Sequence, residues 1–499
     1  MLIAGIAGGM RHGAVALADG GRLLAACSQE RVTRVRSAGV NSTGLPDEAM
    51  DLLLQRLGRT RGDITRSVAA DNPGGRRSNL LFEYIDHHLA HACTAYLTSP
   101  FERAAIIVCD HESPGLSVYR GDGETMHRVD VANTGACFAS LYTRLAAAFG
   151  FALPSGDQQF EALARLQPGH RDADADRLLH RADGALVVDP DLERRIEIRL
   201  AGDRGPDSDV RASLAAAFQQ RLGELFVDFL SDVRTAVGAD RLCLGGSFFY
   251  HSSINTQIAQ SGLFAEVFVP IDPGDSGLAV GAAKYALNAP PSLAPPFLGP
   301  CYSRDEIKQT LDNCKLQYQL ESDDAVGAAV QALQQGYLVG WFDGAMEWGH
   351  RALGARCILA NPAAPYVLEN LNRFLKRREP WRGYALSVLQ EAAGTHFAGP
   401  PTAHFMEYDY RPLQPAPLAH VLPSSGASIR LHTVGSESGP PRFRRLLEAF
   451  RDATGMPYLV NTSFNGFHEP IVCSPRDAVR VFYGTGLDVL VLDRFVLRK

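Results

Sequence analysis

Residues 86–91, which read Asp-His-His-Leu-Ala-His, hold the sharpest candidate for a metal site. If this stretch is helical, His87 and His91 lie four positions apart and share one face. Two imidazoles at that spacing can bind one cation, with a carboxylate from elsewhere completing the ligand set. No glutamate separates the two histidines, so the zinc-protease HExxH motif is absent. The alternative is a helix capped by Asp86 whose histidines are simply hydrogen-bonded.

A second candidate lies near the carboxyl end, where an apolar run from Leu459 breaks into polar residues and glycine. Such a run predicts a buried strand that ends in a loop. Asn461, Ser463 and Asn465 alternate along it, and alternate residues of an extended segment face the same side. They would form one amide- and hydroxyl-bearing wall of a pocket. A polar strand edge or an Asx-type turn is the alternative.

A basic cluster precedes a Pro-Trp turn in residues 372–382. It holds Lys376, Arg377, Arg378 and Arg382, in a chain of net charge −6. Guanidinium groups match the geometry of phosphate, so the cluster indicates an anion site. A solvated helix face is the alternative. Because the chain has neither a P-loop nor a GxGxxG motif, any nucleotide site is of another kind.

Two glycine-flanked stretches could also serve a ligand. Asp275 stands between glycines ahead of a small-residue segment that we predict to be a helix, 277–287. An aspartate there either caps the helix or binds a metal beside a phosphate. Gly245 and Gly246 could let the backbone approach a ligand closely.

Composition excludes several classes of protein. The 499 residues are 46% hydrophobic and 21% charged, which is ordinary for a globular protein of several domains. The net acidic charge argues against nucleic acid as a partner. The nine cysteines form no CxxC pair, so a structural zinc site of that type is not expected. The start of the chain lacks a signal-peptide pattern and no apolar run is long enough to span a bilayer. We therefore expect a cytoplasmic protein without membrane partners.

The order of predicted elements indicates an α/β fold in two parts. A strand and a hairpin at the start, followed by a helix, suit an actin-like ATPase-type domain. A proline-rich stretch, 289–300, cannot continue a helix or a central strand and is predicted to be the main linker. We find no internal repeat in the sequence. The predicted strands are 2–7, 14–18, 22–27, 104–109, 241–246 and 337–342, and the predicted helices are 46–57, 210–237, 277–287, 303–313 and 323–336.

Taken together, these motifs resemble those of the ATP-dependent carbamoyltransferases that modify nodulation factors, cephalosporins and aminoglycosides. The similarity extends over nearly the whole chain. The family motifs and their positions here are HHxAHA at 87–92, SAYxxSPF at 94–101, Gly-Asp-x-Gly at 274–277, GxxEFGPRALG at 344–354, KxREPFRPFAPSV at 376–388, NTSFNxxGEPIVC at 461–473 and TGLDVLVL at 485–492.

The resemblance implies two modules. Residues 1–288 would form an actin-like module similar to enzymes that transfer threonylcarbamoyl groups, followed by the linker 289–300. Residues 301–499 would form a mixed α/β, YrdC-like module similar to threonylcarbamoyl-adenylate synthases. The second module would join carbamoyl phosphate and ATP, as its magnesium complex, into carbamoyl-adenylate. The first would pass the carbamoyl group to a hydroxyl or amine of a small-molecule natural product, as in antibiotic biosynthesis.

The resemblance also implies roles for individual residues. His87, His91, Asp110 and Asp275 would bind a divalent metal, iron(II) in this family, and Gly245, Gly246 and Asp275 would contact the transfer-site nucleotide. His12 would be the general base, with Arg36 at the position of a family lysine. The charged groups for carbamoyl phosphate and ATP would be Arg351, Lys376, Arg378, Arg382 and Arg430, beside the wall of Asn461, Ser463 and Asn465.

Several positions depart from the family pattern, and most lie in the transfer module. A glycine, Gly13, follows His12 where the family has aspartate, and Tyr250 replaces an asparagine. In the second module His350 replaces a proline, and Ser425 replaces an aspartate. We infer that adenylate synthesis is kept and the transfer step altered. Three explanations of the altered module remain open: an unusual acceptor, a module that no longer holds iron, and a non-catalytic nucleotide-binding protein that serves as a partner. The oligomeric state is also open, and a homodimer is among the options.

Overall fold

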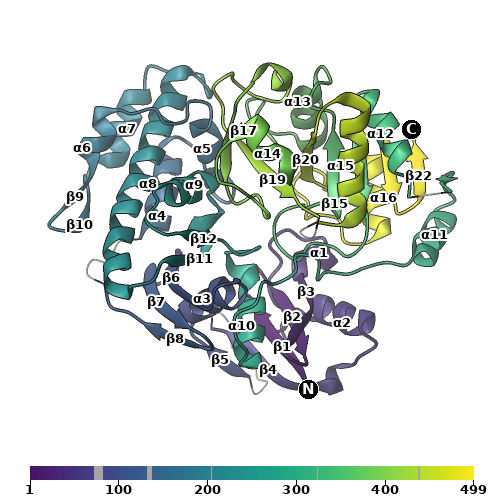
Figure 1. Cartoon of the computed structure of the whole chain (residues 1–499), viewed down its shortest axis with the longest axis horizontal. Helices are drawn as coiled ribbons and strands as arrows, with labels where there is room; N and C mark the ends of the chain where they lie inside the picture. The colour runs from purple at the N-terminus through teal and green to yellow at the C-terminus, as the bar shows by residue number, and fades with distance from the viewer. Residues whose placement is uncertain (72–81, 132–136, 204, 323, 437–438) are drawn as a thin grey trace.

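A computed structural model describes residues 1–71, 82–131, 137–203, 205–322, 324–436 and 439–499. The fold is mixed α/β, as predicted. Two five-stranded sheets and a small two-stranded sheet lie in the N-terminal part, and one ten-stranded sheet organises the C-terminal part (Figure 1). The predicted helices and strands are present with small shifts at their ends, although residue 323 lies outside the described residues.

The first sheet has the order β3-β2-β1-β4-β5. Its central strand β1 is buried along its whole length, as its apolar sequence predicts. The strands β1 to β3 are antiparallel neighbours, whereas β4 and β5 run parallel to β1. Their bounds are β1 (Leu2–Ala7), β2 (Ala14–Asp19), β3 (Arg22–Ser28), β4 (Ile64–Ala70) and β5 (Glu83–Ile85).

The second sheet repeats this topology. Its order is β8-β7-β6-β11-β12, with β6 to β8 antiparallel and with β11 and β12 parallel to β6. The two sheets therefore share one topology, although the sequence shows no internal repeat. The repeat leaves no trace in the sequence, because many apolar sequences can form the same buried strand. The bounds are β6 (Arg103–Cys109), β7 (Leu116–Asp122), β8 (Thr125–Arg128), β11 (Arg241–Gly245) and β12 (Glu266–Phe268).

Helices α3 (His87–Leu97) and α10 (Leu278–Leu287) pack closely together and bring the two sheets to one site. Small residues make this approach possible. A Cβ atom on Gly281 of α10 would lie 2.3 Å from Thr94 Oγ1 of α3. A Cβ atom on Gly5 of β1 would lie 2.1 Å from the carbonyl oxygen of Ala279. The glycines therefore fix how close the two helices and β1 can lie.

The long helix α8 (Asp209–Val237) carries the core of the second half of this part. It begins where Ser208 accepts a hydrogen bond from the Arg211 amide and ends at Gly238, which adopts a φ of 65°. The serine is a typical N-cap residue, and a glycine with positive φ is a typical C-terminal cap. Further elements are α1 (Gln29–Thr33), α2 (Asp47–Arg56), η1 (Arg61–Asp63), α4 (Phe138–Ala148), α5 (Gly156–Ala164), α6 (Ala173–Leu178), β9 (Leu179–Ala182), β10 (Ala185–Val188), α7 (Leu192–Leu200), η2 (Ser247–Tyr250), α9 (Ser252–Gln260) and η3 (Asp275–Gly277).

The proline-rich stretch forms neither helix nor strand, and it is bound to both parts of the molecule. The Ala26 amide of β3 donates to the Leu298 carbonyl over 2.9 Å. From the other side, the Trp348 indole donates to the Pro295 carbonyl over 3.0 Å. The stretch therefore fixes the two parts against each other, and the boundaries 1–288 and 301–499 remain a prediction.

The ten-stranded sheet has the order β13-β22-β21-β14-β15-β20-β16-β19-β18-β17. Its central strand β20 carries the polar wall predicted from the sequence, and a YrdC-like classification of this part remains a prediction. The bounds are α11 (Arg304–Asn313), β13 (Gln319–Leu320), α12 (Val326–Gln334), β14 (Val339–Phe342), β15 (Arg356–Ala360), α13 (Val367–Glu369), η4 (Asn370–Lys376), β16 (Ala385–Leu389), α14 (Gln390–His396), β17 (Phe397–Ala398), β18 (Asp409–Pro412), η5 (Ala416–Leu418), β19 (Ile429–Val434), α15 (Pro441–Thr454), β20 (Tyr458–Ser463), α16 (Pro475–Gly484), β21 (Val489–Leu492) and β22 (Phe495–Arg498).

In the part of the chain that the structure describes, no helix has both the length and the apolar character needed to cross a bilayer.

Candidate functional site

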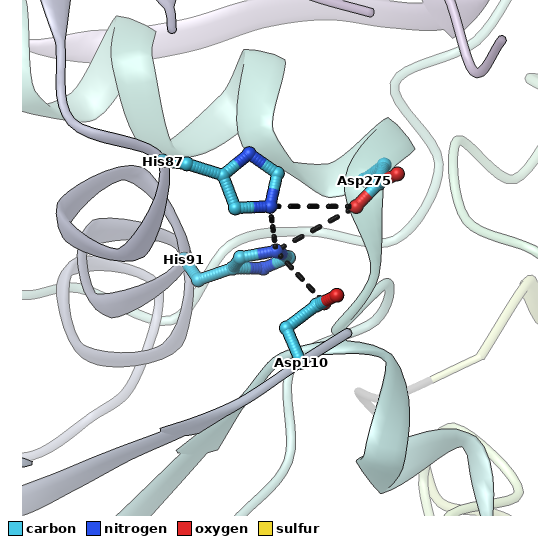
Figure 2. A group of neighbouring side chains, drawn as sticks. All are labelled: His87, His91, Asp110 and Asp275. Atoms are coloured by element: carbon cyan, nitrogen blue, oxygen red, sulfur yellow. Dashed lines mark hydrogen bonds and ion pairs between the residues drawn. The ribbon is translucent and has the colours of Figure 1, made fainter. Parts of the chain in front are cut away.

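Two imidazoles of α3 and two carboxylates from distant parts of the chain meet at one point (Figure 2). Asp86 caps α3 by accepting the Leu89 amide over 2.9 Å, so both the helix and its cap are as predicted. The spacing places the Nε2 atoms of His87 and His91 3.2 Å apart. His88 turns elsewhere and contacts the Glu112 carbonyl through its own Nε2, at 3.1 Å.

Asp110 follows the last residue of β6, and Asp275 opens η3 just ahead of α10. The Nε2 atom of His91 lies 3.1 Å from Asp110 Oδ2 and 3.6 Å from Asp275 Oδ1. Asp275 is the N-cap residue of neither helix, because Gly274 occupies that position in η3 and Gly277 in α10. The capping alternative for Asp275 is therefore wrong, and its carboxylate faces the histidines instead.

Burial and charge act against each other in this group. Burial lowers the pKa of His91, but the two carboxylates outweigh it and raise the pKa to about 9. Burial lowers the pKa of His87, which is further from a carboxylate. Burial also raises the pKa of Asp110, yet the contact with His91 holds it well below its usual value. Two imidazole nitrogens and two carboxylates within 4.8 Å of one another form a donor set that fits a divalent transition metal.

A cavity of about 590 Å³ opens between the two parts of the molecule. Its walls come from both. The four residues of the metal-type group do not line it, but Ser276, next to Asp275, does. Among the predicted site residues it is lined by His12, Arg36, Arg351, Lys376, Arg378, Arg382, Arg430, Asn461, Ser463 and Asn465.

Lys376 joins the basic cluster to the polar wall. The helix η4 ends at Lys376, and Arg377 then adopts a φ of 46°, which turns the chain out of the helix. The Lys376 ammonium donates to the Ser463 carbonyl and to Asn465 Oδ1, each over 2.6 Å. Burial, with the nearby Arg378, lowers the pKa of Lys376 well below its usual value. The solvated-face alternative is therefore wrong for Lys376, which is only 8% exposed.

Asn461 is oriented by residues that the sequence did not single out. Its Nδ2 donates to Ser387 Oγ over 2.8 Å and to the Ala352 carbonyl over 3.0 Å. Ser387 Oγ in turn lies 3.0 Å from His432 Nδ1, and both residues are buried. Among the described residues, Asn461 Oδ1 has no hydrogen-bond partner. The amide oxygen is therefore a fixed and unused acceptor beside the cavity.

The guanidinium groups in and beside this cavity differ in whether a carboxylate neutralises them. Arg165, which the sequence analysis missed, binds Glu161 at 2.6 Å and Asp409 at 2.8 Å. These two carboxylates are thereby neutralised. Arg351 and Arg430 share the same neighbourhood, and burial lowers the pKa of both. The cavity consequently presents positive charge that an anion would satisfy.

Other predicted residues lie at the edge of the cavity or outside it. Arg36 is exposed, and its Nη1 lies 3.3 Å from His468 Nδ1. The two glycines at the end of β11 are explained by the protein itself. A Cβ atom on Gly245 would lie 2.8 Å from the His91 carbonyl oxygen, and one on Gly246 would lie 2.1 Å from the Cys109 carbonyl oxygen. Contact between these glycines and a nucleotide remains a prediction.

Several known proteins align with this chain. A protein of Synechocystis sp., described as uncharacterized, is 31% identical over 84% of this chain and 76% of its own length. The nodulation protein NolNO of Sinorhizobium fredii is 28% identical over 98% of this chain and 79% of its own. A solved structure of full-length HypF, with phosphate and nucleotide bound, aligns with 57% of this chain and 46% of its own, at 14% identity and a TM-score of 0.40.

Two family models match the chain in order along its length. The model described as the carbamoyltransferase N-terminus matches residues 76–284, and the model described as the carbamoyltransferase C-terminus matches residues 330–499. Together they span most of the sequence, and they agree with the resemblance derived from its motifs. This chain belongs to the carbamoyltransferase family.

Proposed function

We propose that the C-terminal part of the chain forms carbamoyl-adenylate from carbamoyl phosphate, ATP and one water. The water cleaves carbamoyl phosphate into carbamate and phosphate, and the carbamate oxygen then attacks the α-phosphorus of ATP, which releases pyrophosphate. The N-terminal part transfers the carbamoyl group to a small-molecule acceptor. The observation that supports this most strongly is the cavity lined by both parts, with Lys376, Arg351 and Arg430 on one side of it. Both substrates are polyanions, and fixed positive charges stabilise the charge that develops as phosphoryl bonds break.

In this proposal the polar wall of Asn461, Ser463 and Asn465 binds the carbamoyl group. The carbamoyl NH₂ would donate to Asn461 Oδ1, the buried acceptor that lacks a partner among the described residues. Ser463 and Asn465 are held in place by Lys376, so the wall is rigid before substrate arrives. Preorganised groups of this kind lower the entropic cost of aligning two substrates.

We assign the metal, iron(II) by family resemblance, to His87, His91, Asp110 and Asp275. When bound, a divalent cation there supplies a Lewis acid next to the adenylate phosphate. The nucleotide would lie near Gly245 and Gly246, and magnesium would accompany ATP in the other half-site.

Transfer requires a base for the acceptor. A hydroxyl or amine of the acceptor attacks the carbamoyl carbon, the bond from that carbon to the phosphate oxygen breaks, and AMP leaves. His12 lines the cavity, and an imidazole there can accept the acceptor's proton at neutral pH. In this proposal Arg36 lies at the cavity edge beside the AMP phosphate.

Purified protein supplied with ATP, magnesium and carbamoyl phosphate tests the first half-reaction without knowledge of the acceptor. We expect pyrophosphate and inorganic phosphate to appear together, and neither to appear when carbamoyl phosphate is omitted. A protein that binds ATP yet forms no pyrophosphate under these conditions would contradict the proposal and favour a non-catalytic partner role.

A further inference from the structure

Two of the positions that depart from the family pattern, Tyr250 and His350, are in contact although they lie in different family domains. Their rings meet edge to face, with centroids 4.4 Å apart. Both also face Asp272, which is buried. The Tyr250 hydroxyl donates to Asp272 Oδ1 over 2.5 Å, and His350 Nδ1 lies 3.9 Å from the same oxygen. We call these three residues the throat.

The throat adjoins both groups of side chains assigned above. Asp272 is three residues before Asp275 of the metal-type group in the sequence. On the other side, the Tyr250 carbonyl is 3.5 Å from Arg351 Nη2, which belongs to the anion-binding side. All three throat residues line the cavity shared by the two parts. The cavity also reaches Ser276, next to Asp275, so the throat residues lie on the wall of the space that adjoins both groups.

The backbone around the throat is fixed at close range. A Cβ atom on Gly349 would lie 2.5 Å from Ile271 Cγ2, and one on Gly274 would lie 2.3 Å from the Tyr250 hydroxyl. Arg31, itself buried, donates to the Gly349 carbonyl over 2.8 Å. The residues flanking Asp272 and His350 therefore have little freedom, and the width of the throat depends on the three side chains themselves.

We propose that Tyr250, held by Asp272 and His350, closes the passage between the two half-sites and retains the carbamoyl-adenylate until an acceptor is bound. This inference rests on the proposed function, since it concerns the movement of that intermediate. Tyr250 is a positioning residue here. It keeps water from the intermediate; when water does reach it, water adds to the carbamoyl carbon, the bond to the phosphate oxygen breaks, and AMP, carbamate and protons are released.

The test uses the full chain with ATP, magnesium and carbamoyl phosphate, and no acceptor. For the wild type we expect one equivalent of pyrophosphate in a burst, followed by slow release of AMP. Tyr250→Phe keeps the ring and removes the bond to Asp272. Because one charge-assisted hydrogen bond is lost, AMP release should rise about ten-fold while the burst is unchanged. His350→Ala removes the side chain that packs against the Tyr250 ring, so it should also raise the rate of AMP release.

Tyr408→Phe is the matched control. Its hydroxyl also bonds between the two parts, to the Val267 carbonyl over 3.1 Å, but Tyr408 does not line the cavity. We expect it to release AMP at the wild-type rate. If both throat variants release AMP as slowly as the wild type, the proposed role of the throat is wrong. The same holds if folded Tyr250→Phe protein shows no burst of pyrophosphate. Absence of pyrophosphate from the wild type would instead overturn the proposed function.

Discussion

Replacing Lys376 with methionine tests the assignment of the anion-binding half-site most directly. Methionine has similar length and fills the same space but carries no charge and no donor. In the native protein the ammonium lies within 3.1 Å of three acceptors: the Ser463 carbonyl, the Asn465 carbonyl and Asn465 Oδ1. The variant leaves these oxygens without that donor.

Two consequences of the change have different sizes. Each lost bond to a charged group is worth about 1.5–3 kcal/mol, but the ammonium no longer has to be desolvated, which offsets much of this. We expect the unfolding free energy to fall by about 2–4 kcal/mol. Loss of a positive charge aimed at a phosphoryl group should cost a further 10²- to 10³-fold in the rate of pyrophosphate formation, as for a lost oxyanion-hole donor.

The assay is pyrophosphate release from ATP and carbamoyl phosphate, measured below the melting temperature of each variant. Lys284→Met is the control, because Lys284 is also a buried lysine, with Nζ 2.9 Å from Ser292 Oγ, but lies outside the cavity. The control should lose some stability and keep its rate. If Lys376→Met forms pyrophosphate within about three-fold of the wild-type rate, our account of this half-site is wrong.

Three further predictions address other parts of the structure. His91→Ala should lower the metal content of purified protein measured by mass spectrometry and leave pyrophosphate formation intact; unchanged metal content would contradict the ligand assignment. Arg165→Met removes the ion-pair partner of the buried carboxylates Glu161 and Asp409, so urea unfolding should show an unfolding free energy lower by about 3–5 kcal/mol. A decrease of less than about 1 kcal/mol would mean that water solvates these carboxylates well. Burial lowers the pKa of His432 to about 3, below its value near 6.5 in the unfolded chain. Between these two pH values the native protein therefore binds fewer protons at His432 than the unfolded chain does. The unfolding free energy consequently falls as the pH drops below about 6.5. The melting temperature of His432→Asn, whose amide can replace the bond to the neighbouring serine, should therefore fall less between pH 7 and pH 5 than that of the wild type, and equal falls would refute this.

The helix that carries the metal-type histidines could be predicted because its signals are local. The spacing of His87 and His91 places them on one face of any α-helix, and Asp86 is a strong capping residue. The alternation of Asn461 and Ser463 along a strand is local in the same way.

The roles of Asp275 and Gly246 could not be settled from the sequence. An aspartate at a helix start suits capping and metal binding equally well, and only the packing of α10 against α3 turns Asp275 toward the histidines. Gly246 suggested a close ligand, whereas the structure shows the backbone of Cys109 in that place.

By itself the sequence determined the family and the order of helices and strands, because motifs and hydrophobic periodicity depend on residues that are near one another in the chain. Tertiary structure alone decided which distant residues meet. The contact of Tyr250 with His350, the ion pair between Arg165 and Asp409, and the repeated sheet topology all join segments far apart in the chain. Such contacts depend on how whole layers pack, and no local pattern of residues encodes that packing.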